Sequence, residues 1–196
     1  MTRTGVVMTR TTKTMTKRLG KRRAARTLIA LSVLLASATV AAAVALAGDG
    51  ALPPELQDVR AAVARYHSFE QAQSDGYALR SGEPCVRSPL GTMGYHVANA
   101  ALMADDAIDP LRPELLLYTA DQNGNLKLVG VEYWKRDGDG SLATSDDRPT
   151  LFGQPFDGPM PGHNPTMPVH YDLHVWVAEE NPSGVFAMFN PSLSCP

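Results

Sequence analysis

Four of the five histidines in this 196-residue sequence fall into two short blocks that also contain methionine. His96 closes the first block, which begins at Met93, and the other three lie between residues 160 and 174. Imidazole nitrogens bind zinc, copper, nickel and iron, whereas a thioether favours Cu(I). The sequence therefore predicts a metal site with copper favoured over zinc, and the candidate ligands are His96, His163, His170, His174, Met93, Met160 and Met167.

The spacing of the histidines limits how many of them one ion can bind. His170 and His174 lie on one face of a predicted strand, and at a rise of roughly 3.3 Å per residue their Cα atoms would be about 13 Å apart. That separation is too large for a shared ion unless the strand bends or bulges. We therefore expect one ion held by His96, His163 and one of the two strand histidines.

Two further side chains are predicted to support the ligands. Asp172 lies between the strand histidines on the same face, where its carboxylate could accept a hydrogen bond from a ligating imidazole and fix its tautomer. Tyr95 directly precedes His96. A metal-free alternative uses the same His–Asp face for a small-ligand pocket or for general acid–base chemistry. A third alternative is a cell-envelope interaction protein without a site, which predicts dispersed histidines and an exposed apolar patch.

The two cysteines, Cys85 and Cys195, are predicted to form a disulfide bond. Two cysteines in an exported chain usually pair. The bond would join the last residues of the chain to the beginning of its globular part.

Residues 1–47 have the composition of a secretory signal peptide. They contain nine Lys or Arg and no acidic residue, and an apolar stretch over 27–47 ends in Ala45-Leu46-Ala47. A basic region, an apolar region and small residues at a cleavage site are the parts of such a signal. The alternative is an uncleaved membrane anchor, because about twenty apolar residues can span a bilayer. We expect cleavage and a secreted or otherwise extracytoplasmic protein without membrane contact.

Residues 48–196 are predicted to form one globular domain with a strong acidic excess. They carry the other nine Lys and Arg against all twenty Asp and Glu, which gives a net charge of −11. A nucleic-acid-binding domain needs a basic surface, so nucleic acid is excluded as an expected partner. The expected partner is a metal ion or a small ligand.

Two segments of this domain have the pattern of helices. Apolar residues recur at steps of three and four over 55–77, which is typical of an amphipathic helix. Residues 97–104 predict a short second helix. Residues 81–94 predict a loop around Cys85, and the many prolines over 135–168 exclude a helix and most strand pairing there.

Four segments predict strands. Residues 114–118 and 126–134 should form a hairpin, because Asn-Gly in the connection favours a tight turn. Residues 169–177 alternate strictly, with His170, Asp172 and His174 on one face, and the apolar run 185–189 predicts a last strand. The expected fold is α+β, with an N-terminal helix packed on an antiparallel sheet, and the alternative is a β-sandwich or jelly-roll with an added helix.

Two blocks of the sequence resemble a known group of proteins. Gly91-Thr-Met-Gly-Tyr-His96 and Met167-Pro-Val-His-Tyr-Asp-Leu-His-Val-Trp176, together with Asn190-Pro191 and Cys195, resemble small exported bacterial proteins of unassigned function, over most of residues 55–196. The resemblance implies export but no particular activity. The sequence departs from the cupins, whose first motif places two histidines one residue apart, because three residues separate His170 from His174.

Overall fold

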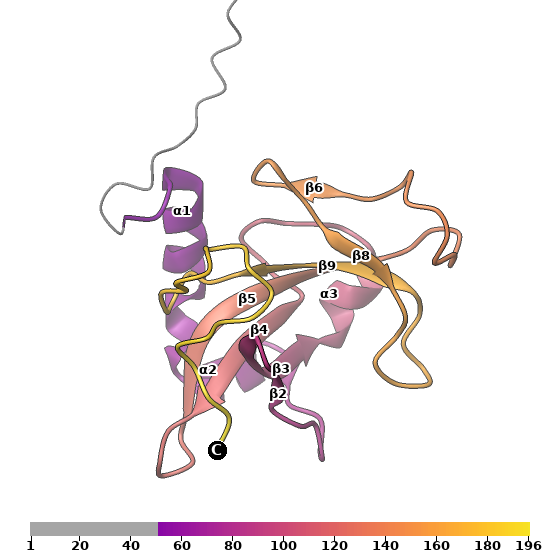
Figure 1. Cartoon of the computed structure of the whole chain (residues 1–196). Coiled ribbons are helices and arrows are strands. Elements are labelled where there is room, and N and C mark those ends of the chain that lie inside the picture. Colours follow the sequence, from indigo (N-terminus) through magenta and orange to yellow (C-terminus); the bar gives the residue numbers. More distant parts are fainter. Residues whose placement is uncertain (1–50) are drawn as a thin grey trace, which may run out of the picture. The chain divides into compact units, whose positions relative to one another are not determined.

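An antiparallel sheet forms the centre of the computed structural model, which describes residues 51–196 (Figure 1). Its strands follow the order β1 (Tyr77–Ala78), β3 (Gly91–Asn99), β4 (Leu115–Ala120), β5 (Leu126–Arg136), β9 (His170–Val175) and β8 (Asp157–Met160), and β2 (Val86–Ser88) also pairs with β3. A separate hairpin contains β6 (Thr150–Leu151) and β7 (Gln154–Pro155). The signal peptide expected over 1–47 lies outside the described residues.

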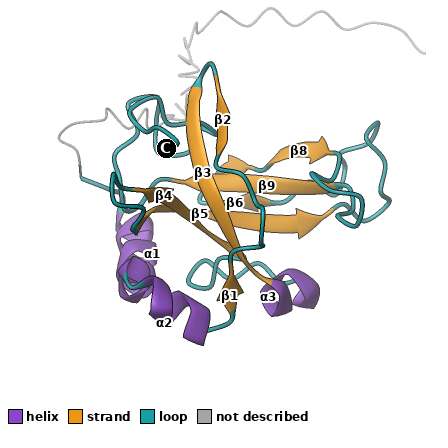
Figure 2. Ribbon diagram, turned by 90° about the horizontal axis from the view of Figure 1, so that it is seen from below, coloured by secondary structure: helices purple, strands orange, loops and turns teal. Residues whose placement is uncertain are grey.

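Helices beside one antiparallel sheet confirm the expected α+β class. Figure 2 shows α1 (Pro54–Val63) and α2 (Phe69–Ser74) together on one side of the sheet, with α3 (Ala100–Asp105) at the end of β3. The β6–β7 hairpin is the only other sheet within residues 51–196. The β-sandwich or jelly-roll alternative is therefore wrong. No helix in this part of the chain is long and apolar enough to cross a bilayer.

The single helix expected over 55–77 is divided into three segments. α1 ends at Val63, and a 3-10 turn, η1 (Ala64–His67), follows it. Ser68 then has extended backbone, and its side chain accepts a hydrogen bond from the Gln71 N–H at 3.2 Å, so it caps α2. Serine is a favoured N-cap residue, and here it starts a new helix in a changed direction.

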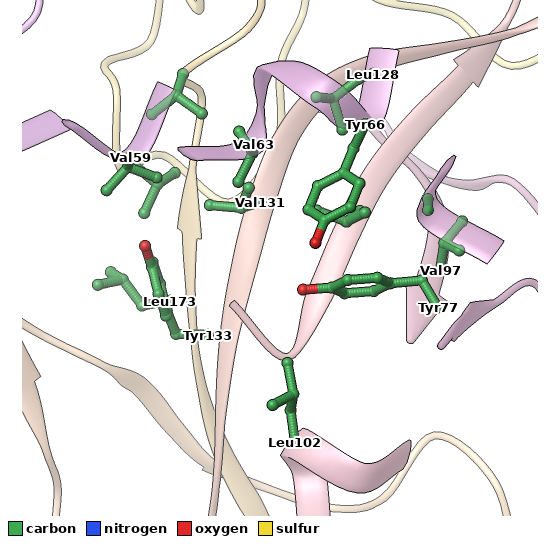
Figure 3. Packing of buried hydrophobic residues seen from close by; sticks show 14 of the residues in the cluster. Val59, Val63, Tyr66, Tyr77, Val97, Leu102, Leu128, Val131, Tyr133 and Leu173 are labelled. Atoms are coloured by element: carbon green, nitrogen blue, oxygen red, sulfur yellow. The ribbon is translucent and has the colours of Figure 1, made fainter. Parts of the chain in front are cut away.

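The apolar face of these helices was predicted correctly, and it packs on the sheet (Figure 3). Val59, Val63 and Tyr66 are buried against residues of β5 and β9 that include Val131 and Leu173. Three buried tyrosines in this core place their hydroxyl groups on backbone carbonyls at 2.6 Å each: Tyr77 donates to Pro113, Tyr118 to Tyr66 and Tyr133 to Pro110. The three tyrosine hydroxyl groups are thus satisfied inside an otherwise apolar core.

Two predicted elements are displaced or absent. The helix expected over 97–104 begins later, because β3 continues to Asn99, whose side chain then caps α3 by accepting from the N–H groups of Ala101 and Leu102. The loop expected over 81–94 contains β2 and the start of β3. The strand expected over 185–189 does not form, and these residues lie in turns.

The proline-rich segment forms more paired strands than its sequence predicted. Residues 135–168, expected to be a loop, contain β6, β7 and β8. Pro155 lies in the small hairpin, and Pro159 lies in β8 at the edge of the main sheet, where the register with β9 is irregular. Both positions fit the rule that proline occurs in strands at edges and irregularities.

The disulfide between Cys85 and Cys195 is confirmed. It fixes the end of the chain beside β2, and the Thr92 and Asn190 backbones exchange two hydrogen bonds of 3.0 Å nearby. Gly91 makes this contact possible, because a Cβ added there would lie 2.5 Å from the Asn190 carbonyl carbon and oxygen. A disulfide of this kind is typical of proteins in oxidising compartments.

Candidate metal centre

His96, Glu132 and His174 form a cluster on the sheet face opposite α1 and α2, and we call it the triad. One ligand atom from each side chain can be chosen such that all three atoms lie within 4.8 Å of one another. The His96 Nε2 lies 3.1 Å and the His174 Nε2 lies 3.8 Å from Glu132 Oε2. The side chains of His174 and Glu132 are 1% and 3% exposed, and that of His96 is 14% exposed.

Strand register brings these three side chains together from distant parts of the sequence. Glu132 of β5 pairs directly with His174 of β9, and Leu115 of β4 lies on the other side of Glu132. His96 of β3 is across β4 from β5. Gly94, with φ of +102°, lets β3 lie close against β4, because a Cβ there would be 2.3 Å from the Tyr118 carbonyl oxygen.

Electrostatic coupling within the triad keeps its carboxylate ionised. Burial acts to raise the pKa of Glu132, but His96 and His174 lower it to about 2. Burial acts to lower the pKa of His174, but the carboxylates of Glu132 and Asp172 raise it to about 9. The negative field of the two carboxylates therefore favours a cation at this position, whether a proton or a metal ion.

Several buried polar atoms at and beside the triad have no hydrogen-bond partner within residues 51–196. They are Glu132 Oε2, Trp134 Nε1, His170 Nε2, Asp172 Oδ1, His174 Nδ1 and His174 Nε2. Buried polar atoms are nearly always paired, so such a concentration calls for an explanation. Coordination of a metal ion would satisfy Glu132 Oε2 and His174 Nε2 together.

A pocket of about 550 Å³ opens over the triad. His96 and Glu132 line it, whereas His174 is not among its lining residues. The walls come from residues 80–86, β3, α3, β4, β5 and the loop over 163–168. The triad thus lies at the inner end of a cavity of the size that takes small molecules.

The other expected histidine ligands lie apart from the triad. His170 is stacked on Trp134 with ring centroids 5.7 Å apart, and its Nδ1 lies 3.0 Å from the Pro168 carbonyl oxygen. His163 meets His170 edge to face at 5.1 Å and lines the pocket. The structure therefore brings His96 together with one strand histidine, as expected, but with Glu132 in the place expected for His163.

The methionines and the supporting residues are distributed around this region. Met93 and Met167 line the pocket, and Met160 pairs with His170 across β8 and β9. Asp172 is buried beside the triad, with Oδ1 3.7 Å from His174 Nδ1. Tyr95 packs against the core on the helical face, away from His96, so it does not support the triad.

Glu132 was not among the residues expected at the site, although the sequence contains a signal for it. It is the only acidic residue between Leu126 and Trp134, in a segment of otherwise mainly apolar character. A buried carboxylate is rare unless it is paired or binds a metal. What the sequence did not contain was the register that places Glu132 beside His174.

Glu114 is another buried carboxyl, and it predicts a pH-dependent change in stability. Its Oε2 accepts a hydrogen bond from the Trp134 N–H at 3.1 Å, and burial raises its pKa from 4.5 to about 7. The folded state therefore binds this proton more tightly than the unfolded state, so stability falls as the pH rises between these two values. The free energy of unfolding of Glu114→Gln, relative to that of the wild type, should therefore increase by about 2–3 kcal/mol as the pH rises from 5 to 8.

Urea unfolding at both pH values, with a chelator present, measures this effect. Glu70→Gln is the control, because Glu70 is exposed. Its unfolding free energy should differ from that of the wild type by the same amount at both pH values. A Glu114→Gln protein whose advantage stays constant from pH 5 to pH 8 would contradict the effect of burial on this carboxyl.

Comparison with known proteins finds no matching family model, no matching curated protein and no matching solved structure.

Proposed function

We propose that this protein binds one divalent transition-metal ion through His96, Glu132 and His174. The observation that carries the proposal is the convergence of two imidazole nitrogens and a carboxylate oxygen within 4.8 Å of one another. The ring nitrogens of His174 are buried without hydrogen-bond partners in the described part of the chain, and the buried Glu132 Oε2 has only its ion-pair contacts with His96 Nε2 at 3.1 Å and His174 Nε2 at 3.8 Å. Nitrogen and oxygen lone pairs that face one another in this way are arranged for a shared cation.

The donor set favours a divalent ion with open coordination positions. Two histidines and one glutamate hold zinc in one class of catalytic site, and two histidines with a carboxylate hold iron(II) in another. Three protein ligands leave at least one position for water or a small molecule. That position would face the pocket, because two of the three ligands line it.

The carboxylate argues for zinc(II) over copper(I), which prefers soft thioether ligands. Met93 and Met167 line the same pocket, so the copper preference expected from the sequence depends on one of them joining the triad. Met93→Leu and Met167→Leu test that role, because leucine keeps the apolar volume and removes the sulfur. We expect zinc affinity to change by less than about threefold in either variant, since zinc sites use nitrogen, oxygen and thiolate ligands.

The acid–base alternative has weaker support from the geometry. Asp172 and His174 are each about 1% exposed, so neither can reach a substrate in the pocket directly. The partly exposed member of the triad is His96, whose Nε2 is already directed at Glu132.

We further propose that the protein acts outside the cytoplasm. The Cys85–Cys195 disulfide supports this location, because such bonds persist in oxidising compartments. The signal-peptide composition of residues 1–47 points to the same conclusion.

Metal titration of the purified, tag-free chain tests the proposal. The protein is first stripped with a chelator and then titrated with Zn(II), Cu(II) and Cu(I), and bound metal is counted by elemental analysis. One equivalent of Zn(II) should bind, with a dissociation constant below about 1 µM. Absence of binding at this level for every ion would contradict the proposal. That result would favour the metal-free alternative, a pocket for a small ligand or for acid–base chemistry.

A further inference from the structure

We infer that the pocket over the triad admits a small organic carboxylate with an apolar body. The inference rests on the proposed function for the inner end of the pocket, where a triad-bound ion would supply a coordination position. It adds the class of molecule that would fill the remaining space. Apolar surface and positive charge both border the pocket, and together they indicate this class of molecule.

Most of the pocket wall is apolar. Three methionines, Met93, Met103 and Met167, come from β3, α3 and the loop over 163–168, and Trp134 and Leu115 add rigid surface from β5 and β4. Methionine side chains adapt their shape to different apolar partners. A ligand with a hydrocarbon or aromatic body would bury this wall, and a small hydrophilic molecule would leave it exposed to water.

Two arginines, Arg80 and Arg136, also line the pocket. Both are exposed residues, so they lie toward its opening. Neither makes an ion pair or a side-chain hydrogen bond within residues 51–196. Glu83 lines the pocket as well, and it too forms no ion pair with a described residue.

The two arginines belong to the small set of cationic side chains that no other described side chain or carbonyl holds. Five of the nine cationic side chains in the described residues are held by carboxylates, carbonyls or a hydroxyl: Arg60, Arg65, Lys127, Lys135 and Arg148. The remaining four are Arg80, Arg87, Arg112 and Arg136, and two of these line this pocket. Residues 48–196 carry a net charge of −11, so the domain as a whole repels anions.

A carboxylate is the anion that fits this arrangement. Guanidinium groups bind carboxylates through paired, charge-assisted hydrogen bonds. The apolar wall between the arginines and the triad would take the hydrocarbon part of the same molecule. An inorganic anion would satisfy the arginines but would leave the apolar wall without a partner.

Calorimetry with the zinc-loaded full chain tests the inference, with butanoate, octanoate and 4-phenylbutanoate as probes. Each acid is compared with its neutral amide, which has nearly the same shape. Octanoate and 4-phenylbutanoate should bind at least tenfold more tightly than their amides, and both should bind more tightly than butanoate. Quenching of tryptophan fluorescence would report occupation beside Trp134.

Arginine variants test whether Arg80 and Arg136 bind the carboxylate group of the ligand. Arg80→Gln/Arg136→Gln should weaken acid binding at least tenfold and leave amide binding unchanged. Arg87→Gln/Arg112→Gln is the matched control, because it removes the same charge away from this pocket. Equal binding of acids and amides, or an equal loss in the control protein, would overturn the assignment of the ligand class.

Failure of this inference can be told apart from failure of the metal proposal. Uptake of zinc without binding of any acid at 10 mM would overturn the ligand class alone. Arginine-dependent binding of acids by a protein that takes up no zinc would overturn the metal assignment and support the ligand class.

Discussion

Replacement of His174 by alanine is expected to weaken Zn(II) binding by at least about 100-fold, because loss of an outer-shell partner alone typically costs 10–100-fold and a ligand contributes more. His96→Ala and Glu132→Gln should have effects of similar size. Glu132→Gln keeps an oxygen donor but removes the negative charge that neutralises the ion. Competition with a chelator of known zinc affinity measures all three variants.

Two histidine variants serve as controls. His67 is exposed on η1, and His67→Ala should leave zinc affinity within about threefold of the wild type. His163→Ala separates the triad from the ligand set expected from sequence, which included His163 in place of Glu132. A large loss of affinity in His163→Ala with little change in Glu132→Gln would contradict the triad. Because His174 is fully buried, His96→Ala is the safer variant for folding, and circular dichroism should confirm its structure.

Removal of the disulfide is expected to have the largest effect on stability. Cys85 and Cys195 are separated by 110 residues. Closing a loop of about 100 residues restricts the unfolded chain by an amount worth about 4–5 kcal/mol. Cys85→Ser/Cys195→Ser should therefore lower the free energy of unfolding by about that amount. Urea denaturation followed by circular dichroism gives the value.

Reduction of the wild-type protein by dithiothreitol provides an independent comparison. The reduced wild type and the double variant should unfold at similar urea concentrations. The bond also holds one wall of the pocket, since Pro84 and Val86 flank Cys85 and line the pocket. If the double variant were as stable as the oxidised wild type, the disulfide would not stabilise the fold by restricting the conformations of the unfolded chain.

Three strands, β4, β5 and β9, were predictable because their signals are local. The alternation over 169–177 placed Tyr171, Leu173 and Val175 on one face of β9, and all three lie in the core. The polar face with His170, Asp172 and His174 was also correct, although burial of both faces was not evident from alternation. The β4–β5 hairpin formed where Asn-Gly predicted its turn.

Elements that depend on distant partners were less predictable. Apolar residues over 185–189 resemble a strand, but they find no strand to pair with and lie in turns beside Trp176, whose N–H donates to the Val185 carbonyl at 2.9 Å. The helix over 55–77 was divided at Ser68, whose capping role depends on the chain turning toward β1. Periodicity alone gave the buried face but not this division.

The candidate site was half predictable for the same reason. His96 and His174 were found by residue type, because few other side chains offer nitrogen ligands. Glu132 joined them only through the pairing of β5 with β9, which links residues about 40 positions apart. His163 was expected because it lies in the same block as His174, but it contacts His170 at 5.1 Å between ring centroids.

Anomalous diffraction from crystals of the zinc-loaded, tag-free protein would show which side chains hold the ion. Data recorded on both sides of the zinc absorption edge locate the ion without assumptions about its ligands. The triad predicts one strong peak about 2.0–2.2 Å from a ring nitrogen of His96, a ring nitrogen of His174 and a carboxylate oxygen of Glu132. A peak held by His163 and His170, or zinc confined to surface carboxylates, would contradict the assignment of the metal centre.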